Sequence, residues 1–308
     1  MIDFVGKRKW YFLVSGIIIL IGVIFLLSVG LQRGIEFTGG TMVTIRFEQA
    51  VTQEELREEL AVLGHDDAII QWSGDAQAFV IRTTELSEED VVVMQNALTE
   101  AFGTLTIVEV YAISGSIASD IEGNAMMAVI VAAIGILLYV TWAFRRLMRP
   151  FRYGVCAIVA LLHDVIIVLG IFSILGVIFD MEIDAMFIVG VLTIIGYSVN
   201  DTIVVFDRIR ENSIKSPGTP FATTVNNSIM ETLGRSLNTV ITTLFVILAL
   251  LLLGGATIHN FALVLLIGVI SGTYSSIFIA SQLLVVWDSG AFGRLFRRVV
   301  PKRAPAGG

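Results

Sequence analysis

The stretch YGVCAIVALLHDVIIVLGIFSILGVI, residues 153–178, decides the fold class of this chain. Its single acidic residue, Asp164, follows His163 near the middle of an otherwise apolar run. A helix needs about 20 apolar residues to cross the hydrocarbon core of a bilayer. The stretch therefore predicts a membrane-spanning helix, and a charge kept inside such a helix indicates a functional role or a specific polar partner.

The rest of the chain contains five more runs of this kind, near residues 11–30, 124–144, 185–206, 238–257 and 261–286. Hydrophobic residues make up 56% of the chain and charged residues 15%, whereas soluble domains average about 45–50% and about 25%. We expect an α-helical membrane protein with six membrane-spanning helices. The first is interpreted as an uncleaved anchor, because its apolar run is longer than that of a usual signal peptide.

Basic residues predict the orientation of these helices. Lysine and arginine cluster at residues 7–9, 145–152, 208–215 and 294–303. Six spans place all four clusters on one side, and the positive-inside rule assigns that side to the cytoplasm. Both termini are then expected to be cytoplasmic.

The segment between the first two spans lies on the opposite side and is strongly acidic. Residues 31–122 hold 17 acidic and 4 basic side chains, whereas the rest of the chain holds 10 acidic and 16 basic ones. The bases form short clusters next to the spans and no single basic face, which disfavours nucleic-acid binding. We divide the chain into an N-terminus with the first helix, an extracytoplasmic domain, helices 2–6 and a basic tail, at residues 1–32, 33–122, 123–288 and 289–308.

Alternating and helical periods predict the fold of the extracytoplasmic domain. Strands are expected at 41–47, 68–72, 78–83 and 105–113, and helices at 52–63 and 87–102. Thr52 with Glu55 forms a capping box in sequence, Ser87 is an N-cap and Gly103 ends the second helix. The order β-α-β-β-α-β predicts a ferredoxin-like α+β domain. This fold implies no function by itself, and His65 is interpreted as an ordinary loop histidine.

The fourth span carries the most polar sequence, GYSVNDTIVVFDRIRE at residues 196–211. Tyr197, Asn200 and Asp201 share one helix face by their i, i+3 and i+4 spacing. We interpret this face as lining a wet cavity, with Asp201 about two helical turns inside the membrane boundary. The alternative is that Asn200 and Asp201 only bond to neighbouring helices. Asp207, Arg208 and Arg210 lie at the interface, where an orienting role is favoured.

Arg235 is predicted to enter the next span at about the depth of Asp201, because the two spans run antiparallel. A guanidinium beside a carboxylate favours its ionised form, and uptake of a proton would loosen the pair. The two residues therefore suggest a proton-gated switch. The alternative is that Arg235 extends its charged end to the interface.

Three further features stand out in the spans. His163 and Asp164 form a candidate relay, with packing as an equal alternative. Gly268 and Gly272 have the spacing of closely packed helices, and Tyr274 follows them. The only cysteine is Cys156, and no metal, nucleotide or nucleophile motif is present. We therefore predict neither a cofactor nor an enzyme.

At these residues the chain strongly resembles the SecF family, within the RND (resistance-nodulation-division) superfamily. The matching stretches are GIEFTGGT at 34–41, LHDV at 162–165, residues 196–211, ETLGRS at 231–236 and GTYSSIF at 272–278. They extend from end to end of the chain. The family usually has aspartate at Glu36, and serine or threonine are commoner around Arg235.

The resemblance implies a subunit of protein export in the bacterial cytoplasmic (inner) membrane. It implies a SecD partner, the SecYEG channel, SecA, YidC/YajC-type accessory proteins, a translocating polypeptide, membrane lipid and use of the proton-motive force. It also implies that Asp201 and Arg235 are the functional polar residues at the SecD–SecF interface. Two alternatives stay open: an RND-type exporter of small molecules or lipids, and a structural scaffold without proton coupling.

Overall fold

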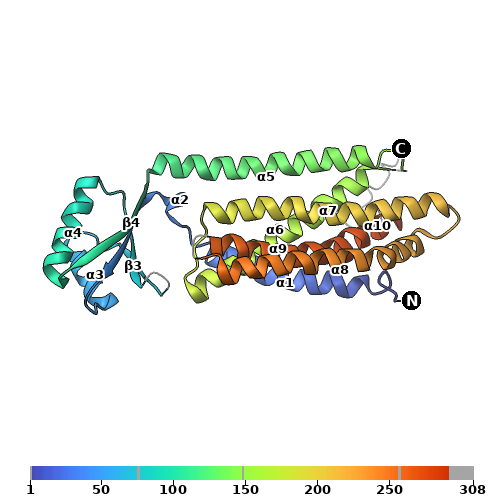
Figure 1. Cartoon of the computed structure of the whole chain (residues 1–308). Coiled ribbons are helices and arrows are strands. Elements are labelled where there is room, and N and C mark those ends of the chain that lie inside the picture. The colour runs from blue at the N-terminus through green and yellow to red at the C-terminus, as the bar shows by residue number, and fades with distance from the viewer. Residues whose placement is uncertain (1, 75–76, 148, 256–257, 291–308) are drawn as a thin grey trace, which may run out of the picture. The chain divides into compact units, whose positions relative to one another are not determined.

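The computed structural model describes residues 2–74, 77–147, 149–255 and 258–290, and the chain divides into two compact units (Figure 1). The first comprises residues 1–31, 128–181 and 186–308, and the second comprises residues 32–127 and 182–185. We call them the membrane unit and the sheet unit. Of the predicted tail, only Ser289 and Gly290 fall within the described residues.

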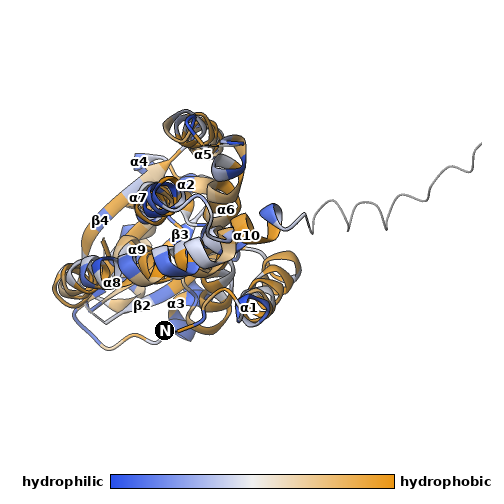
Figure 2. Cartoon of the chain, turned by 90° about the vertical axis from the view of Figure 1, so that its right-hand side faces the viewer, coloured by the Kyte–Doolittle hydropathy of each residue, from blue (hydrophilic) through white to orange (hydrophobic). Residues whose placement is uncertain are grey.

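The described residues contain six helices long and apolar enough to cross a membrane, which confirms the predicted number. They are α1 (Arg8–Ser28), α5 (Gly115–Ala143), α6 (Phe151–Phe179), α7 (Ala185–Lys215), α8 (Phe221–Leu253) and the helix His259–Asp288. The last consists of α9 (His259–Ser275), the π-helical turn η2 (Ser276–Ala280) and α10 (Ser281–Asp288). Hydrophobic residues predominate in these helices, which Figure 2 shows nearly end-on.

Helix α8 begins well before the span that the sequence predicts at residue 238. It starts after Pro220, whose ring lacks an N–H group that a helix would have to satisfy. Its first turns are polar but largely buried, including Thr224, Asn226 and Ser228. The length of an apolar run does not predict these first turns of α8, because their buried side chains are polar and hydrogen-bonded. Arg235 consequently lies inside α8 and not at its start.

Small residues bring the helices of the membrane unit close together. A Cβ on Gly170 of α6 would lie 2.6 Å from Gly22 Cα of α1, so only glycine fits there. A Cβ on Gly268 would lie 2.4 Å from Ile194 Cγ2 of α7, and one on Gly272 would lie 2.9 Å from Ser198 Cβ. Helix α9 therefore packs on α7 through the two glycines of its small-residue spacing.

The sheet unit contains four antiparallel strands in the order β2-β3-β1-β4. Along the chain its elements are α2 (Ile35–Thr38), β1 (Gly40–Phe47), α3 (Gln53–Val62), β2 (Ile69–Ser73), β3 (Ala78–Thr83), α4 (Glu88–Phe102) and β4 (Leu105–Ile113). Side chains of β1, β3, α3 and α4 form the core, among them Val43, Ile45, Leu56, Ile81 and Leu98. Both helices contribute to this core.

Local signals in the sheet unit act as the sequence predicts. Thr52 and Glu55 form a capping box at α3, and Ser87 caps α4 in the same way with Asp90. The hydrogen bond from the Thr52 backbone N–H, together with that from its hydroxyl, lowers the pKa of Glu55. Gly103 follows α4 with φ 82°, a backbone conformation that favours glycine.

The turn into β1 requires two glycines. Gly39 and Gly40 have φ 72° and 128°, and a Cβ on Gly40 would lie 2.4 Å from the Thr83 carbonyl oxygen. Both the conformation and the space exclude a side chain there. The short helix α2, which the sequence analysis did not anticipate, immediately precedes this turn.

Candidate functional site

Asp164 is the centre of a buried polar cluster in the membrane unit. Its side chain is only 2% exposed. Oδ2 accepts hydrogen bonds from Ser198 of α7 at 2.6 Å and Ser275 of α9 at 2.7 Å. Oδ1 accepts one from Ser271 at 2.7 Å and lies 3.0 Å from His163 Nδ1. The carboxylate thus links α6, α7 and α9 through hydrogen bonds to both oxygens.

The imidazole of His163 extends the cluster to α1. Its Nε2 lies 3.0 Å from the Ser15 hydroxyl, which lies 3.4 Å from the Tyr274 hydroxyl. Tyr274 in turn donates to the Tyr11 carbonyl at 3.0 Å. The chain of hydrogen bonds therefore ends at a backbone carbonyl, which accepts a hydrogen bond but offers no exchangeable proton.

A second layer of hydroxyls lies beside this cluster where the helix becomes π-helical. Thr202 of α7 and Ser276 of η2 are 2.8 Å apart through their hydroxyl oxygens. Ser281 donates to the Ser276 carbonyl at 2.8 Å, five residues back along the chain. Single π-turns inside α-helices frequently mark functional regions. Here the π-turn lies between the polar cluster and the last helix of the unit.

Asp201 lies one helical turn from Ser198 and faces a different neighbour. Its Oδ1 accepts a hydrogen bond of 2.7 Å from Ser236 of α8. Within the described residues its Oδ2 is buried without a hydrogen-bond partner. Tyr197, one turn earlier, points to the same helix and donates to the Thr243 hydroxyl at 3.4 Å. Asp201 and Tyr197 therefore share a face toward α8.

Arg235 and Asn200, the other residues predicted for this site, do not contact Asp201 through a hydrogen bond or ion pair among the described residues. Arg235 and Asn200 are both exposed. Asp201 bonds to Ser236, the neighbour of Arg235, and the ion pairs of the described residues do not join Asp201 to Arg235. Arg235 and Asp201 lie at a similar depth, because Ser236, which donates to Asp201, directly follows Arg235 in α8.

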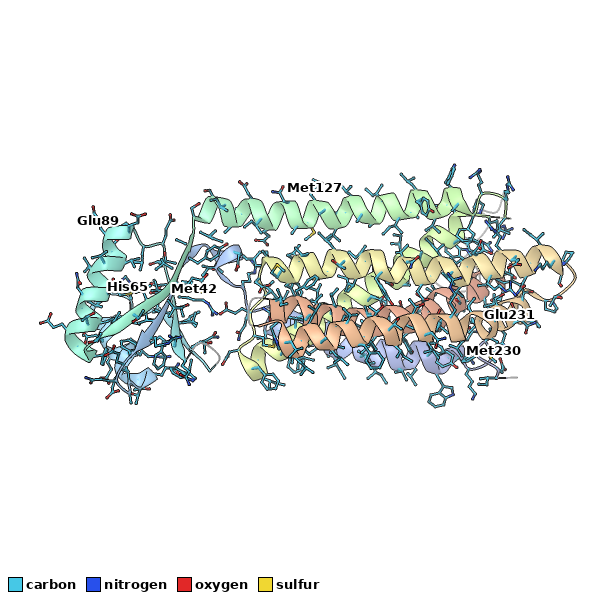
Figure 3. All side chains as sticks on the ribbon, in the orientation of Figure 1. Met42, His65, Glu89, Met127, Met230 and Glu231 are labelled. Atoms are coloured by element: carbon cyan, nitrogen blue, oxygen red, sulfur yellow. The ribbon has the colours of Figure 1, made fainter. Side chains whose placement is uncertain are left out.

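The end of α7 forms a network of ion pairs with α8. Arg208 pairs with Glu211 of its own helix and with Glu231 of α8, each at 2.5 Å. Glu231 is labelled on α8 in Figure 3. Arg210 pairs with Asp207 at 2.6 Å. The ion pairs are partly exposed, and the one between Arg208 and Glu231 joins the C-terminal end of α7 to α8.

The serines that surround the two aspartates were not predicted from the sequence. Ser271 and Ser275 are spaced i, i+4 on α9, a polar pair on one face of an apolar helix, and this spacing is a usable signal. Ser198 and Ser236 carry no such signal, because a single serine in a span is ordinary. His65, labelled in Figure 3, lies 3.5 Å from the Thr83 hydroxyl. Across the described residues, no group of three or more His, Cys, Asp or Glu side chains is arranged to hold a metal ion.

Comparison with known proteins places these features in a family. The family model described as protein export membrane protein SecD/SecF, C-terminal, matches residues 93–290, and the SecD/SecF GG motif matches residues 24–51. A protein translocase subunit SecF from Thermobaculum terrenum is 45% identical over 99% of both chains. SecDF of Bacillus subtilis is 34% identical over 92% of this chain and 38% of its own length.

Solved structures show the same relationship. The crystal structure of SecDF from Thermus, described as a translocon-associated membrane protein, superposes with a TM-score of 0.82 at 36% identity. It covers 94% of this chain and 39% of its own. SecDF in its super-membrane-facing form gives a TM-score of 0.67 at 35% identity, over 96% of this chain and 40% of its own.

Proposed function

Because this chain belongs to the SecF family of protein translocase subunits, we propose that it is the proton-coupled SecF half of a SecD–SecF pair. The chain spans about two fifths of the SecDF proteins that it matches, and we expect it to act together with a SecD-like half. Six spans with one extracytoplasmic domain fit one half of such an assembly.

The observation that carries this proposal is the state of the Asp201 carboxylate. One oxygen is held by Ser236, and the other is buried without a partner among the described residues. A buried, half-satisfied carboxylate is costly unless it gains a proton, a water or a charged neighbour. Gain and loss of a proton at Oδ2 would therefore change which helices Asp201 binds.

Arg235 and Asn200 serve the same site from the exposed side of α7 and α8. An exposed guanidinium inside an apolar helix needs a partner outside this chain or access to the interface. We assign Arg235 to the SecD-facing surface, where it approaches a carboxylate when the pair changes state. Proton transfer through the field provides about 2.3 kcal/mol per 100 mV for each charge, enough to bias such a change.

Asp164 acts as an anchor in this proposal and not as a relay. Both of its oxygens already accept hydrogen bonds, and the chain through His163 ends at the Tyr11 carbonyl. A carboxylate satisfied by three hydroxyls holds α6, α7 and α9 in register. Ser198 then fixes the turn of α7 that precedes Asp201.

The sheet unit is proposed to be a ferredoxin-like extracytoplasmic domain. The strand order β2-β3-β1-β4, with helices between β1 and β2 and between β3 and β4, supports this fold. Its location outside the cytoplasm follows from the basic clusters at 7–9, 145–152 and 208–215, which assign both termini to the cytoplasm. SecYEG, SecA and YidC/YajC-type proteins are proposed partners through the family.

The test is proton uptake and protein export by the SecD-paired chain in liposomes with an imposed proton-motive force. Asp201→Asn keeps the hydrogen bond with Ser236 but cannot change charge, so both activities are expected to fall to the background of SecD–SecF-free vesicles. Asp207→Asn is the matched control, an aspartate of the same helix paired with Arg210 at its end. It should retain both activities.

Other outcomes would separate the alternatives. Full export by Asp201→Asn without proton uptake by the unmodified pair would favour a scaffold. Proton uptake linked to a small molecule or lipid, with no effect on export, would favour an exporter. Asp164→Asn should lower both activities in this assay and also lower the thermal unfolding midpoint of the purified chain. Loss of proton uptake with an unchanged midpoint would favour the relay interpretation of Asp164.

A further inference from the structure

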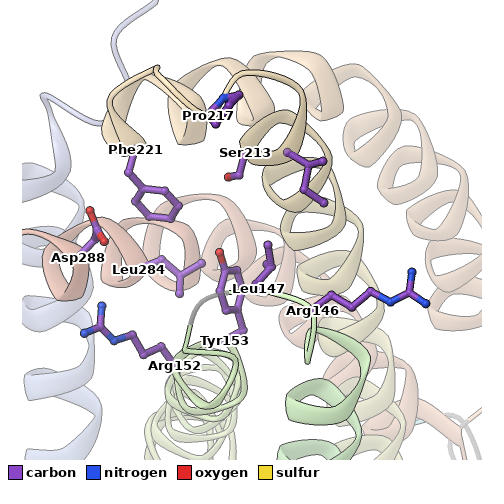
Figure 4. A pocket seen from close by; sticks show the side chains of 10 residues that line it. Arg146, Leu147, Arg152, Tyr153, Ser213, Pro217, Phe221, Leu284 and Asp288 are labelled. Carbon is purple, nitrogen blue, oxygen red and sulfur yellow. The ribbon is translucent and has the colours of Figure 1, made fainter.

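A hollow opens in the membrane unit where α6 and α8 begin and α7 and α10 end. Its volume is about 380 Å³, within the range of small-ligand pockets. Figure 4 shows the side chains that line it, with Arg152 and Arg146 on opposite sides. The lining residues are Arg146, Leu147, Arg152, Tyr153, Ser213, Ile214, Pro217, Phe221, Leu284 and Asp288.

Tyr153 presents a polar group to this hollow. The residue is only 6% exposed, with its ring stacked on Phe144 at 5.3 Å. Its hydroxyl points into the hollow and makes no hydrogen bond within the described residues (Figure 4). A tyrosine hydroxyl usually finds a partner when its ring is buried. The hydroxyl is therefore available to donate to an acceptor oxygen of an occupant.

The charges around the hollow favour a single negative charge. Two guanidinium groups, Arg146 and Arg152, face one carboxylate, Asp288, which leaves one positive charge in excess. Arg152 is held over the ring of Trp287, with its Cζ 5.6 Å from the ring centroid. This contact orients the guanidinium before anything binds. A phosphodiester, which carries one negative charge, matches this balance.

The remaining walls are apolar and the site is at the membrane boundary. Leu147, Ile214, Phe221 and Leu284 line the hollow beside the charged groups. Trp142 lies at the C-terminal end of α5, with its ring 4.4 Å from the Arg145 Cζ, and Trp287 lies at the C-terminal end of α10. Tryptophan is enriched at the headgroup level of membranes. Inorganic phosphate gains nothing from contact with apolar side chains, whereas a lipid can pack its glycerol and first methylene groups against them.

We propose that this hollow binds the headgroup of a monoanionic phospholipid, with the phosphate between Arg152 and the Tyr153 hydroxyl. Basic pockets between membrane helices commonly bind anionic headgroups. The bound lipid would join the N-terminal ends of α6 and α8 to the C-terminal ends of α7 and α10, and so stabilise this part of the membrane unit. The proposal depends on the hollow alone and stands whether or not Asp201 couples to protons.

The experiment is native mass spectrometry of the delipidated full-length chain titrated with phosphatidylglycerol, phosphatidylcholine or inorganic phosphate. Arg152→Ala should weaken phosphatidylglycerol binding about fivefold, the effect of one arginine near a membrane surface. Tyr153→Phe should weaken it less. Arg145→Ala is the matched control, since Arg145 lies in the link just before α6 but stacks on Trp142 and does not line the hollow.

Asp288→Asn keeps the test decisive if another variant folds poorly. Removing the carboxylate should tighten phosphatidylglycerol binding about fivefold, which a damaged fold cannot imitate. Equal loss in Arg145→Ala and Arg152→Ala, no gain in Asp288→Asn, or equal binding of phosphatidylcholine would overturn the proposal. Displacement of the lipid by millimolar inorganic phosphate would show a free-phosphate site and overturn it too.

Discussion

The two aspartates of the membrane unit differ in the number of donors that reach them. Asp164 accepts hydrogen bonds at both oxygens from serines of two other helices, whereas Asp201 accepts one, from Ser236. A buried polar group without a partner costs about 1–3 kcal/mol. Asp164 is therefore a stabilising residue of the fold, and Asp201 is the residue with capacity left for a proton or a partner.

Glu36 of the sheet unit provides a pH-dependent prediction. Burial raises the pKa of its carboxyl above the ordinary 4.5, and the Asp184 carboxylate adds to this rise. The folded state then binds the proton more tightly, so its contribution to stability is complete below pH 4.5 and is lost as pH rises through the folded pKa. Glu36→Gln should remove this loss, measured by hydrogen exchange of β1 amides in the full-length chain across pH.

Glu55 is the control for this measurement because its shift has the opposite sign. Hydrogen bonds from Thr52 lower the pKa of Glu55, so its contribution is present above 4.5 and is lost as pH falls. Glu55→Gln should therefore speed exchange above pH 4.5, where Glu36→Gln slows it, and leave exchange unchanged at acid pH. Identical exchange profiles for the unmodified chain and Glu36→Gln would show that Glu36 titrates normally.

At the scale of elements, close contacts between helices depend on glycine at a few positions. Helices α1 and α6 meet at Gly22 and Gly170, where backbone contacts backbone. Helix α5 contrasts with them, because only 6% of its apolar window is buried and Met127 projects from it (Figure 3). The contact between α1 and α6 is therefore specific, whereas most of the α5 surface is available to lipid or a partner.

Gly170→Ala should destabilise the membrane unit by about 1–3 kcal/mol, the usual cost of overpacking, because the new methyl would meet the Gly22 backbone. Gly135→Ala in α5 is the control, since no atom lies within 4 Å of its added Cβ. That substitution should be neutral or slightly stabilising, as alanine favours helices over glycine. Thermal unfolding in detergent measures both, and equal midpoints would argue against a tight α1–α6 contact.

At the scale of the whole molecule, the link between α6 and α7 belongs to the sheet unit. Ile183 N–H donates to the Gln32 carbonyl at 2.8 Å, and Gly34 N–H donates to the Ile183 carbonyl at 2.9 Å. Glu182 pairs with Arg82 of β3, with side chains only 13% and 16% exposed. The residues just before α7, the helix that carries Asp201, are therefore bonded to the sheet. Under the proposed proton coupling, movement of α7 is expected to alter the 182–185 link and its bonds to the sheet.

A charge exchange tests this link. Arg82→Glu and Glu182→Arg should each weaken export and open the 180–185 link to protease, since a charged hydrogen bond contributes about 1.5–3 kcal/mol. The double exchange should restore both. Arg33 and Glu122 provide the control pair, 53% exposed and in the same unit, where reversal should cost less than about 1 kcal/mol. Single variants with full export would show that the link does not transmit movement.

The six spans and the order of elements in the sheet unit could be predicted from the sequence alone, and the sequence also singled out Asp201 as a candidate. Apolar length, strand and helix periods and capping residues are local properties, so they can be read along the chain. The folded chain was needed to show that Ser198, Ser271 and Ser275 surround Asp164, that Ser236 is the partner of Asp201, and that Glu182 binds Arg82. Those contacts join residues distant in sequence, and which polar groups meet depends on how the helices and strands pack.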